Sequence, residues 1–224
     1  IKNGWLVANP FRELGQGSEA NVARNIYIPR DMFERVLDAT NDVEFRLLLA
    51  MSRYAGLRCP SEVTKLLWST IDLEIDIFTA KAPKTERHEG HERREVPIFP
   101  ELRCRILEAQ AQAVGPMMFP RHQITGAAIT SKLTRTLRSI DEALWPKPFV
   151  NLRASCEHDW LMAGHKINEV AAWMGHSADT MLKHYNRVVK EQQVRAASAL
   201  LRVVPGSSKR SKNRSSTGVH KRQA

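Results

Sequence analysis

The stretch from Asp42 to Ala55 constrains the fold most strongly, because its apolar residues cover nearly the whole circumference of a helix. The residues concerned are Val43, Phe45, Leu47, Leu48, Leu49, Ala50, Met51 and Tyr54. A helix that is apolar all round has to be buried on every side. We therefore predict a globular domain with this helix at the centre of its core.

The residues that follow this helix predict a turn beside the core. Gly56 ends the helix, and the chain then runs through Leu57, Arg58 and Cys59 to Pro60. Proline is favoured at the first position of a helix, so a new helix is expected to begin there. Arg58 should therefore project from a turn next to the core.

The rest of the chain predicts further helices and one antiparallel hairpin. Residues 73–80 alternate between apolar and polar, residues 95–99 form a second strand-like run, and the segment between them is polar and charged. Helical spacing of apolar residues recurs at 30–39, 102–113, 127–140, 151–164, 167–174 and 194–201. The expected fold class is α+β, mainly helical, with a small antiparallel hairpin or sheet.

Charge and cysteine content narrow the class of protein. The 34 basic and 24 acidic residues give a formal net charge of +10, which points to polyanions as partners. Three cysteines without metal-ligand spacing argue against a secreted scaffold stapled by disulfides. No apolar run approaches the roughly 18 residues that a membrane span needs. The sequence favours a cytoplasmic protein that associates with nucleic acid, and hence with the nucleoid.

The two ends of the chain look different from this folded part. Residues 1–22 lack a sustained apolar period and are interpreted as a linker that arrives from an upstream segment. Residues 205–224 carry six basic and no acidic residues, so six of the ten excess charges lie there. This tail has too few apolar residues to fold and is expected to be a basic, disordered arm. The folded domain is thus expected at 23–204.

Four separated motifs can be connected by their order and spacing. They are Gly56-Leu57-Arg58, Pro83-Lys84-Thr85, Asn151-Leu152-Arg153 and Gly175-His176-Ser177, and the last is followed by Tyr185 nine residues after His176. Together they resemble the tyrosine recombinase (phage integrase) family over about residues 9–185. The resemblance implies that 23–204 is a catalytic domain with a C-terminal helix. It also implies that 1–22 is the linker from a separate N-terminal DNA-binding domain.

The resemblance implies a role for each of five residues around one DNA phosphate. Arg58 and Arg153 would hold its nonbridging oxygens, since a guanidinium group can bind two oxygens at once. Tyr185 would be the nucleophile, Lys84 the general acid for the leaving 5′ hydroxyl, and His176 a hydrogen-bond donor to the phosphate. The implied activity is site-specific cleavage and rejoining of DNA through a 3′-phosphotyrosyl link, as in integration or excision of mobile elements. No metal ion or other cofactor is implied.

The second motif departs from the family pattern, which reads His-x-x-Arg. The position three residues before Arg153 is Val150, which can neither accept nor donate a proton. Deprotonation of Tyr185 would then depend on His158, His165 or a water molecule. A second departure lies in the first motif, where Glu62 follows Arg58 by four residues instead of three.

The hairpin supplies the expected contacts with DNA. Its tip at 86–94 is longer than usual for the family and can extend into a groove of the duplex. We predict that Lys81, Arg87 and Arg94 bind DNA, and Lys81 is also a second candidate for the general acid. Duplex DNA is the expected partner. The amphipathic stretch at 194–201 is expected to dock on a neighbouring protomer in a homotetramer on DNA, or on its own domain.

Two other interpretations also fit the sequence. Residues 167–187 also fit a helix-turn-helix that would read the DNA major groove, but this leaves Arg58, Lys84 and Arg153 without a role. A recombinase relative that binds DNA without cutting it, because of Val150, is the second alternative. The histidines at 88 and 91 lie in a glycine-containing turn and are interpreted as a hydrated loop, not as a metal site.

Overall fold

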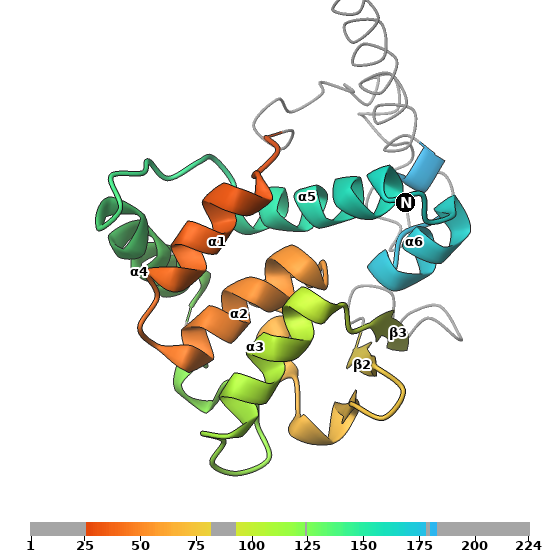
Figure 1. The fold of residues 1–224 in the computed structure, drawn as a ribbon, viewed down its shortest axis with the longest axis horizontal. Helices are drawn as coiled ribbons and strands as arrows, with labels where there is room; N and C mark the ends of the chain where they lie inside the picture. Colours follow the sequence, from red (N-terminus) through yellow and green to blue (C-terminus); the bar gives the residue numbers. More distant parts are fainter. Residues whose placement is uncertain (1–25, 82–92, 124, 178–179, 183–224) are drawn as a thin grey trace, which may run out of the picture.

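The structure, a computed structural model, describes residues 26–81, 93–123, 125–177 and 180–182 (Figure 1). Its α-helices are α1 (Arg30–Asp38), α2 (Val43–Tyr54), α3 (Pro100–Gln110), α4 (Gly126–Arg138), α5 (Pro148–Met162) and α6 (Ile167–Met174). The strands are β1 (Ile71–Asp72), β2 (Ile77–Lys81) and β3 (Arg93–Pro97), and short 3-10 helices lie at Val63–Lys65, Trp68–Thr70 and Pro120–His122. The predicted class, α+β and mainly helical, is confirmed.

Helix α2 is the centre of the core, as its sequence predicts. Its residues from Phe45 to Tyr54 are buried with a single partial exception, and α1, α3 and α5 pack against it. Figure 1 shows α2 between α5 and α3. The Asp42 side chain caps the helix by accepting a hydrogen bond of 3.2 Å from the amide of Phe45. The Arg58 turn follows the other end of α2 and is therefore attached to the buried core.

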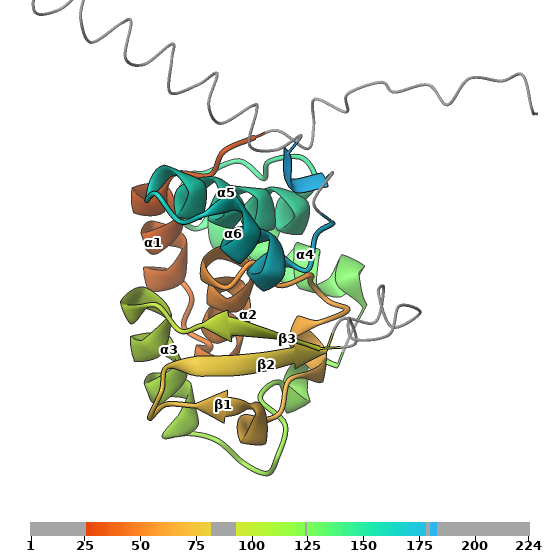
Figure 2. The ribbon, with the colours of Figure 1, turned by 90° about the vertical axis from the view of Figure 1, so that its right-hand side faces the viewer.

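A small sheet lies against α6 on one side of the helices. Its strands are antiparallel in the order β1-β2-β3, and Figure 2 shows β3 next to α6. Phe78 lies opposite Val96, and Ala80 lies opposite Arg94. All four side chains are buried, so this face of the sheet is turned to the core.

The strand boundaries differ from those that the sequence predicts. The first long strand begins at Ile77, because Asp72 accepts hydrogen bonds from the amides of Glu74 and Ile75 and so closes a turn there. The second strand begins at Arg93, two residues before the expected start. Arg94 therefore belongs to the sheet.

The chain before α1 runs along α5 and is held by a row of polar side chains. The amide of Ile26 donates to Asn151 Oδ1 at 3.3 Å, and the amide of Ile28 donates to Ser155 Oγ at 2.9 Å. The Tyr27 hydroxyl donates to Asp159 Oδ1 at 2.8 Å. The three acceptors are four residues apart and therefore share one face of the helix. Helix α5 begins at Pro148, before its predicted start, and Asn151 is an anchor inside the helix instead of its cap.

Asp159 is also the partner of a buried cation. Arg53 on α2 has no exposed side-chain surface, and its Nη2 donates to Asp159 Oδ2 at 2.8 Å and to the Ile28 carbonyl at 3.0 Å. Arg30 Nε donates to the same carboxylate oxygen at 2.8 Å. Burial alone would raise the pKa of Asp159, but the charges and hydrogen bonds of Arg53 and Arg30 hold it below its ordinary value. No helix in the described part of the chain is long and apolar enough to cross a bilayer.

Asp159→Ala is expected to lower the free energy of unfolding by about 3–5 kcal/mol, because it leaves the Arg53 charge buried and unpaired. Chemical denaturation followed by circular dichroism measures this change. Asp38→Ala is the control, since Asp38 is largely exposed and lies 3.8 Å from its partner Arg105. That control should cost less than about 1 kcal/mol. Equal losses in the two variants would contradict the assigned role of Asp159.

Candidate functional site

Arg58 and Glu62 form a closed turn after α2. The Arg58 amide donates to Glu62 Oε2 at 2.9 Å, the Glu62 amide donates to the Arg58 carbonyl at 2.8 Å, and the Arg58 guanidinium group binds Glu62 Oε1. The α-helix expected to begin at Pro60 does not form, because the chain turns here and continues into the 3-10 helix at Val63–Lys65. The four-residue spacing therefore brings the Glu62 carboxylate back onto Arg58, whose side chain is 26% exposed.

Arg153 lies inside α5 and connects two other segments of the site. Its Nη1 donates to the carbonyl of Gly56, and its Nη2 donates to the carbonyl of Met174 at the end of α6. Gly56 has φ +61°, and a Cβ at this position would lie 2.7 Å from Met174 Sδ. Glycine is therefore required both for the backbone conformation and for the close approach of α6.

His176 follows α6 and contacts Arg153 directly. Its Nε2 lies 3.1 Å from Arg153 Nη2, and its Nδ1 lies 3.5 Å from Glu157 Oε2. A guanidinium group has only donors, so Nε2 must be the acceptor. The proton of the neutral ring is then on Nδ1, on the side of Glu157. The structure thus brings together Arg58, Arg153 and His176, which come from three separate motifs.

Arg94 is the third arginine of this site. The sequence predicts it at the DNA-binding tip of the hairpin. That expectation does not match its position: the side chain is 5% exposed and points from β3 towards the core. Its Nη2 and Nη1 donate to Glu62 Oε2 and Oε1 at 2.6 and 3.3 Å, and its Nε donates to the Trp173 carbonyl at 2.7 Å. We call Arg58, Arg94 and Arg153 around Glu62 the guanidinium cluster.

The electrostatics of the guanidinium cluster favour an added anion. Burial would raise the pKa of Glu62, but its bonds with Arg94 and the charge of Arg153, 3.8 Å away, keep it below its ordinary value. Burial lowers the pKa of Arg153 to about 9, and repulsion from Arg58 and Arg94 acts in the same direction. The Arg153 guanidinium group therefore still carries its charge at neutral pH. The guanidinium groups of the cluster outnumber the two nearby carboxylates, Glu62 and Glu157, by one.

The remaining predicted site residues are only partly covered by the structure. Lys84, Arg87 and Tyr185 lie outside the described residues, as does the stretch at 194–201. Lys81 is exposed at the end of β2, opposite Arg93 in the register of the sheet. Its predicted contact with DNA is therefore sterically open.

Val150 and the two histidines considered as its replacement occupy different surroundings. Val150 is 45% exposed and lies one helical turn before Arg153. His158 packs on Tyr27, with ring centroids 4.9 Å apart, and His165 packs on Trp173 at 5.1 Å. Both histidines are thus engaged in aromatic contacts, whereas Val150 is open to the surface.

Sequence reasoning missed the contributions of Arg94 and Glu157 to the site. Arg94 is two residues before the apolar Val96, and this alternation could have placed both on the inner face of a strand. Glu157 is four residues after Arg153, a spacing that puts both on one face of a helix. Neither spacing identifies the partner residue in the folded protein, which is Glu62 for Arg94 and His176 for Glu157.

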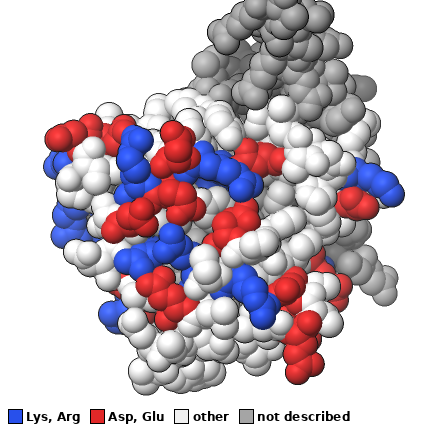
Figure 3. Space-filling view, in the orientation of Figure 1, with Lys and Arg blue, Asp and Glu red and all other residues white. Residues whose placement is uncertain are grey.

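The face of the molecule formed by α1, α2 and α3 is not a uniform basic surface. Figure 3 shows acidic and basic side chains interleaved on this face. Many of them are paired, as in Arg105 with Glu34 at 3.0 Å, Arg30 with Glu101 at 2.8 Å and Arg46 with Glu108. Their charges largely cancel, so this face offers little attraction for a polyanion.

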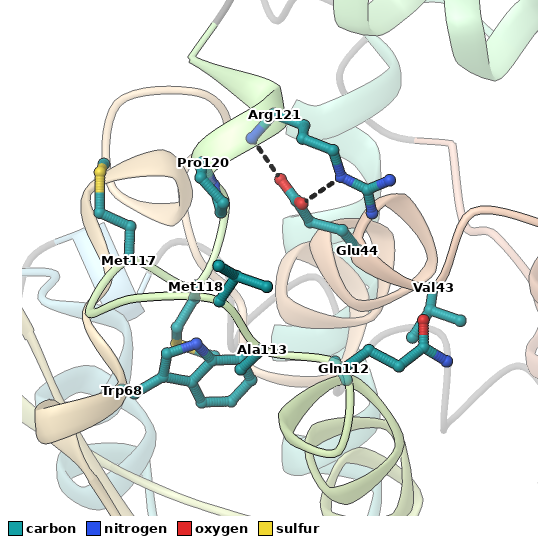
Figure 4. Close-up of a pocket in the computed structure, with 11 residues that line it drawn as sticks. Val43, Glu44, Trp68, Gln112, Ala113, Met117, Met118, Pro120 and Arg121 are labelled. Carbon is teal, nitrogen blue, oxygen red and sulfur yellow. Dashed lines mark hydrogen bonds and ion pairs between the residues drawn. The ribbon is translucent and has the colours of Figure 1, made fainter.

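A cavity of about 320 Å³ lies apart from the guanidinium cluster, near the start of α2 and the end of α3 (Figure 4). Trp68, Met117 and Met118 form part of its mostly apolar lining, and Glu44 and Arg121 pair at its rim at 2.7 Å. It shares no residue with the cluster. Within the described ranges, no group of three or more His, Cys, Asp or Glu residues could hold a metal ion.

Comparison with known proteins gives structural relatives only. No family model matches the sequence, and no curated protein matches it. Among solved structures, the XerA recombinase superposes with a TM-score of 0.58 at 17% identity, over 76% of this chain and 65% of that chain. The Tn1549 transposon integrase, solved with transposon right end DNA, gives a TM-score of 0.63 at 16% identity, over 88% of this chain and 74% of that chain.

A lambda integrase dimer bound to a core site gives a TM-score of 0.55 at 11% identity, over 71% of this chain and 47% of that chain. The chain thus spans about two thirds of the XerA chain and half of the lambda integrase chain. These likenesses show that the fold is that of tyrosine recombinase catalytic domains.

Glu62→Gln is expected to show how far the cluster depends on one carboxylate. At pH 7 it should lower the free energy of unfolding by about 3–5 kcal/mol, because buried arginines lose their counter-charge. The pKa of Glu62 is lower in the folded protein than in the unfolded chain, where it is about 4.3. The wild type therefore has the full stabilisation by the Glu62 carboxylate above this unfolded pKa, and it loses that stabilisation as pH falls through the lower folded pKa. The difference between the two proteins should therefore shrink as pH falls below the unfolded value and through the lower folded value.

Urea unfolding at a series of pH values measures this difference. Glu108→Gln is the control, since the Glu108 side chain is partly exposed whereas that of Glu62 has no exposed surface. A Glu62→Gln effect that is the same at every pH would contradict the depressed pKa.

Proposed function

We propose that this chain, which has the fold of tyrosine recombinase catalytic domains, is a DNA strand transferase that cleaves and rejoins DNA at specific sites. The observation that carries the proposal is the contact between Arg153 and His176, 3.1 Å apart, beside the Arg58–Glu62 turn. Two arginines and a histidine, which together can bind one phosphate, come from three distant segments. A surplus of positive charge at this point supports phosphodiester DNA as the substrate.

Binding of a phosphate would change the partners inside the site. A nonbridging oxygen would take donors of Arg58 and Arg153, because a fixed guanidinium fork suits a phosphate. His176 accepts from Arg153 in the arrangement without DNA, so it has to bind a proton at Nε2 to donate to the phosphate. Glu157, 3.5 Å from Nδ1, would stabilise the resulting imidazolium.

The proposed cleavage needs only the DNA, the side chains of this chain and an acceptor for one proton. The Tyr185 oxygen attacks phosphorus and loses its proton, the bond between phosphorus and the 5′ oxygen breaks, and Lys84 gives that oxygen a proton. The product is a 3′-phosphotyrosyl link and a free 5′ hydroxyl. Attack by another 5′ hydroxyl reverses the step and rejoins the strands. Because Val150 cannot take the proton of Tyr185, a water molecule or a phosphate oxygen accepts it.

The partner and the assembly follow from the same reaction. Exchange of strands between two duplexes requires several active sites, so we propose a homotetramer on duplex DNA with residues 194–201 at the contact between protomers. The linker at 1–22, the catalytic domain at 23–204 and the basic tail at 205–224 are part of this proposal, as is association with the nucleoid. The Tn1549 and lambda integrases were solved with DNA, which supports duplex DNA as the partner.

A relative that binds DNA without cutting it is the second candidate. The exposed Val150, one turn before Arg153, favours it, because the family places a histidine there. The helix-turn-helix interpretation is weaker, since α6 buries Val170 and Met174 in the core and its last turn is bound by Arg153 and Arg94.

Tyr185→Phe should abolish covalent capture of DNA, because phenylalanine has no oxygen to attack phosphorus. The full-length protein is incubated with a pool of nicked duplexes of randomised sequence, and adducts that survive detergent are counted on a denaturing gel. Tyr27→Phe is the control, since the Tyr27 hydroxyl binds Asp159. An undiminished adduct in Tyr185→Phe would refute the nucleophile. No adduct in the wild type would favour the non-cutting candidate.

Val150→His should raise the rate of adduct formation on the order of 10²-fold, because it supplies a proton acceptor one turn from Arg153. Single-turnover capture of the same duplexes measures the rate. Val150→Ala serves as the matched variant and should leave the rate within about threefold, since neither residue carries a proton. A histidine variant no faster than the alanine variant would mean that another group already accepts the proton.

A further inference from the structure

Arg94 connects three segments of the candidate site. It lies opposite Ala80 on the inner face of the sheet, and from there its guanidinium group binds both oxygens of Glu62, at 2.6 and 3.3 Å. Its Nε donates to the Trp173 carbonyl at 2.7 Å. One side chain therefore joins β3 to the turn after α2 and to the last turn of α6.

The turn that presents His176 also packs on Arg94. Gly175 has φ +61°, and a Cβ there would lie 3.3 Å from Arg94 Cδ and 3.5 Å from Arg94 Nη1. The positive φ favours glycine, and a Cβ at this position would be in tight contact with the Arg94 side chain. The position of His176 thus depends on the place that the Arg94 side chain occupies.

Glu62 connects Arg94 to the other two arginines of the cluster. Its Oε1 accepts from Arg58 Nη1 and Arg94 Nη1, and its Oε2 accepts from the Arg58 amide and Arg94 Nη2. Arg153 Nη1 lies 3.8 Å from the same Oε2. Without Arg94, the carboxylate would be held from one side only and could follow Arg58 or Arg153.

We propose that Arg94 is a positioning residue that couples the β2–β3 sheet to the guanidinium cluster and that does not itself contact DNA. The inference rests on the proposed function, because the groups it positions are those assigned to the phosphate. Its side chain is 5% exposed and fully engaged with Glu62 and Trp173, so a DNA oxygen could reach it only by displacing the carboxylate. A displacement of β3 would be transmitted through Arg94 to Arg58 and His176.

Hydrogen exchange of the full-length protein tests this coupling without DNA. Arg94→Met should speed exchange at least tenfold at the amides of Glu62 and Val63, which donate to the Arg58 carbonyl at 2.8 and 3.2 Å. The same should hold at the amide of His176, which donates to the Ala171 carbonyl at 3.0 Å. Amides of α2 should keep their protection, since a loss there as well would indicate general destabilisation.

Arg93→Met is the matched control, because it removes the same charge from the neighbouring, exposed position of β3. It should leave exchange at the site unchanged. Arg94→Lys covers the case in which Arg94→Met does not fold: it keeps the charge but loses the planar fork, and it should give the same local increase in exchange.

Binding to random-sequence duplex DNA at several salt concentrations provides the second readout. Arg94→Lys and Arg94→Met should bind with the wild-type salt slope and within about threefold of its affinity, while adduct formation at saturating DNA falls at least 10²-fold. A salt slope reduced by about 1 in Arg94→Met, with unchanged exchange at the site, would make Arg94 a DNA contact and overturn the proposal. Altered exchange together with no adduct even in the wild type would instead refute the proposed function and retain the coupling.

Discussion

The arrangement of this domain around its candidate site depends on one buried carboxylate. Glu62 accepts hydrogen bonds from Arg58 and Arg94, and Arg153 lies 3.8 Å from it. A carboxylate and guanidinium groups removed from water are stable only if each finds a charged partner. The arginines come from the turn after α2, from β3 and from α5, and their common partner Glu62 therefore holds these three segments together.

Helix α5 is the rigid element that orients the cluster. Near its start Asn151 holds the chain before α1, near its end Asp159 holds Arg53 and Arg30, and Arg153 lies between these anchors. A side chain on a helix fixed at two points keeps its place while its hydrogen-bond partners change, as the proposed binding of a phosphate requires. In the proposed function, a bound phosphate would compensate the surplus positive charge of the cluster.

The sequence predicts those parts of the fold that depend on local patterns. The all-round apolar pattern identifies α2 as the core, and the motifs around Arg58, Arg153 and His176 identify residues that the structure brings together. Arg94 was assigned to the wrong environment because the strand starts two residues earlier than its propensities indicate, and alternation then turns the side chain inwards. Its partner Glu62 is 32 residues away, and no local signal specifies such a pair.

The most direct test of this arrangement is a structure of the full-length chain with a nicked duplex and orthovanadate, which takes the place of the transferred phosphate. We expect vanadium to be bonded to the Tyr185 oxygen, its other oxygens to be bound by Arg58, Arg153 and His176, and Glu62 still to be held by Arg94. Vanadate bound elsewhere, or a Tyr185 hydroxyl directed away from both guanidinium groups in the DNA complex, would contradict it.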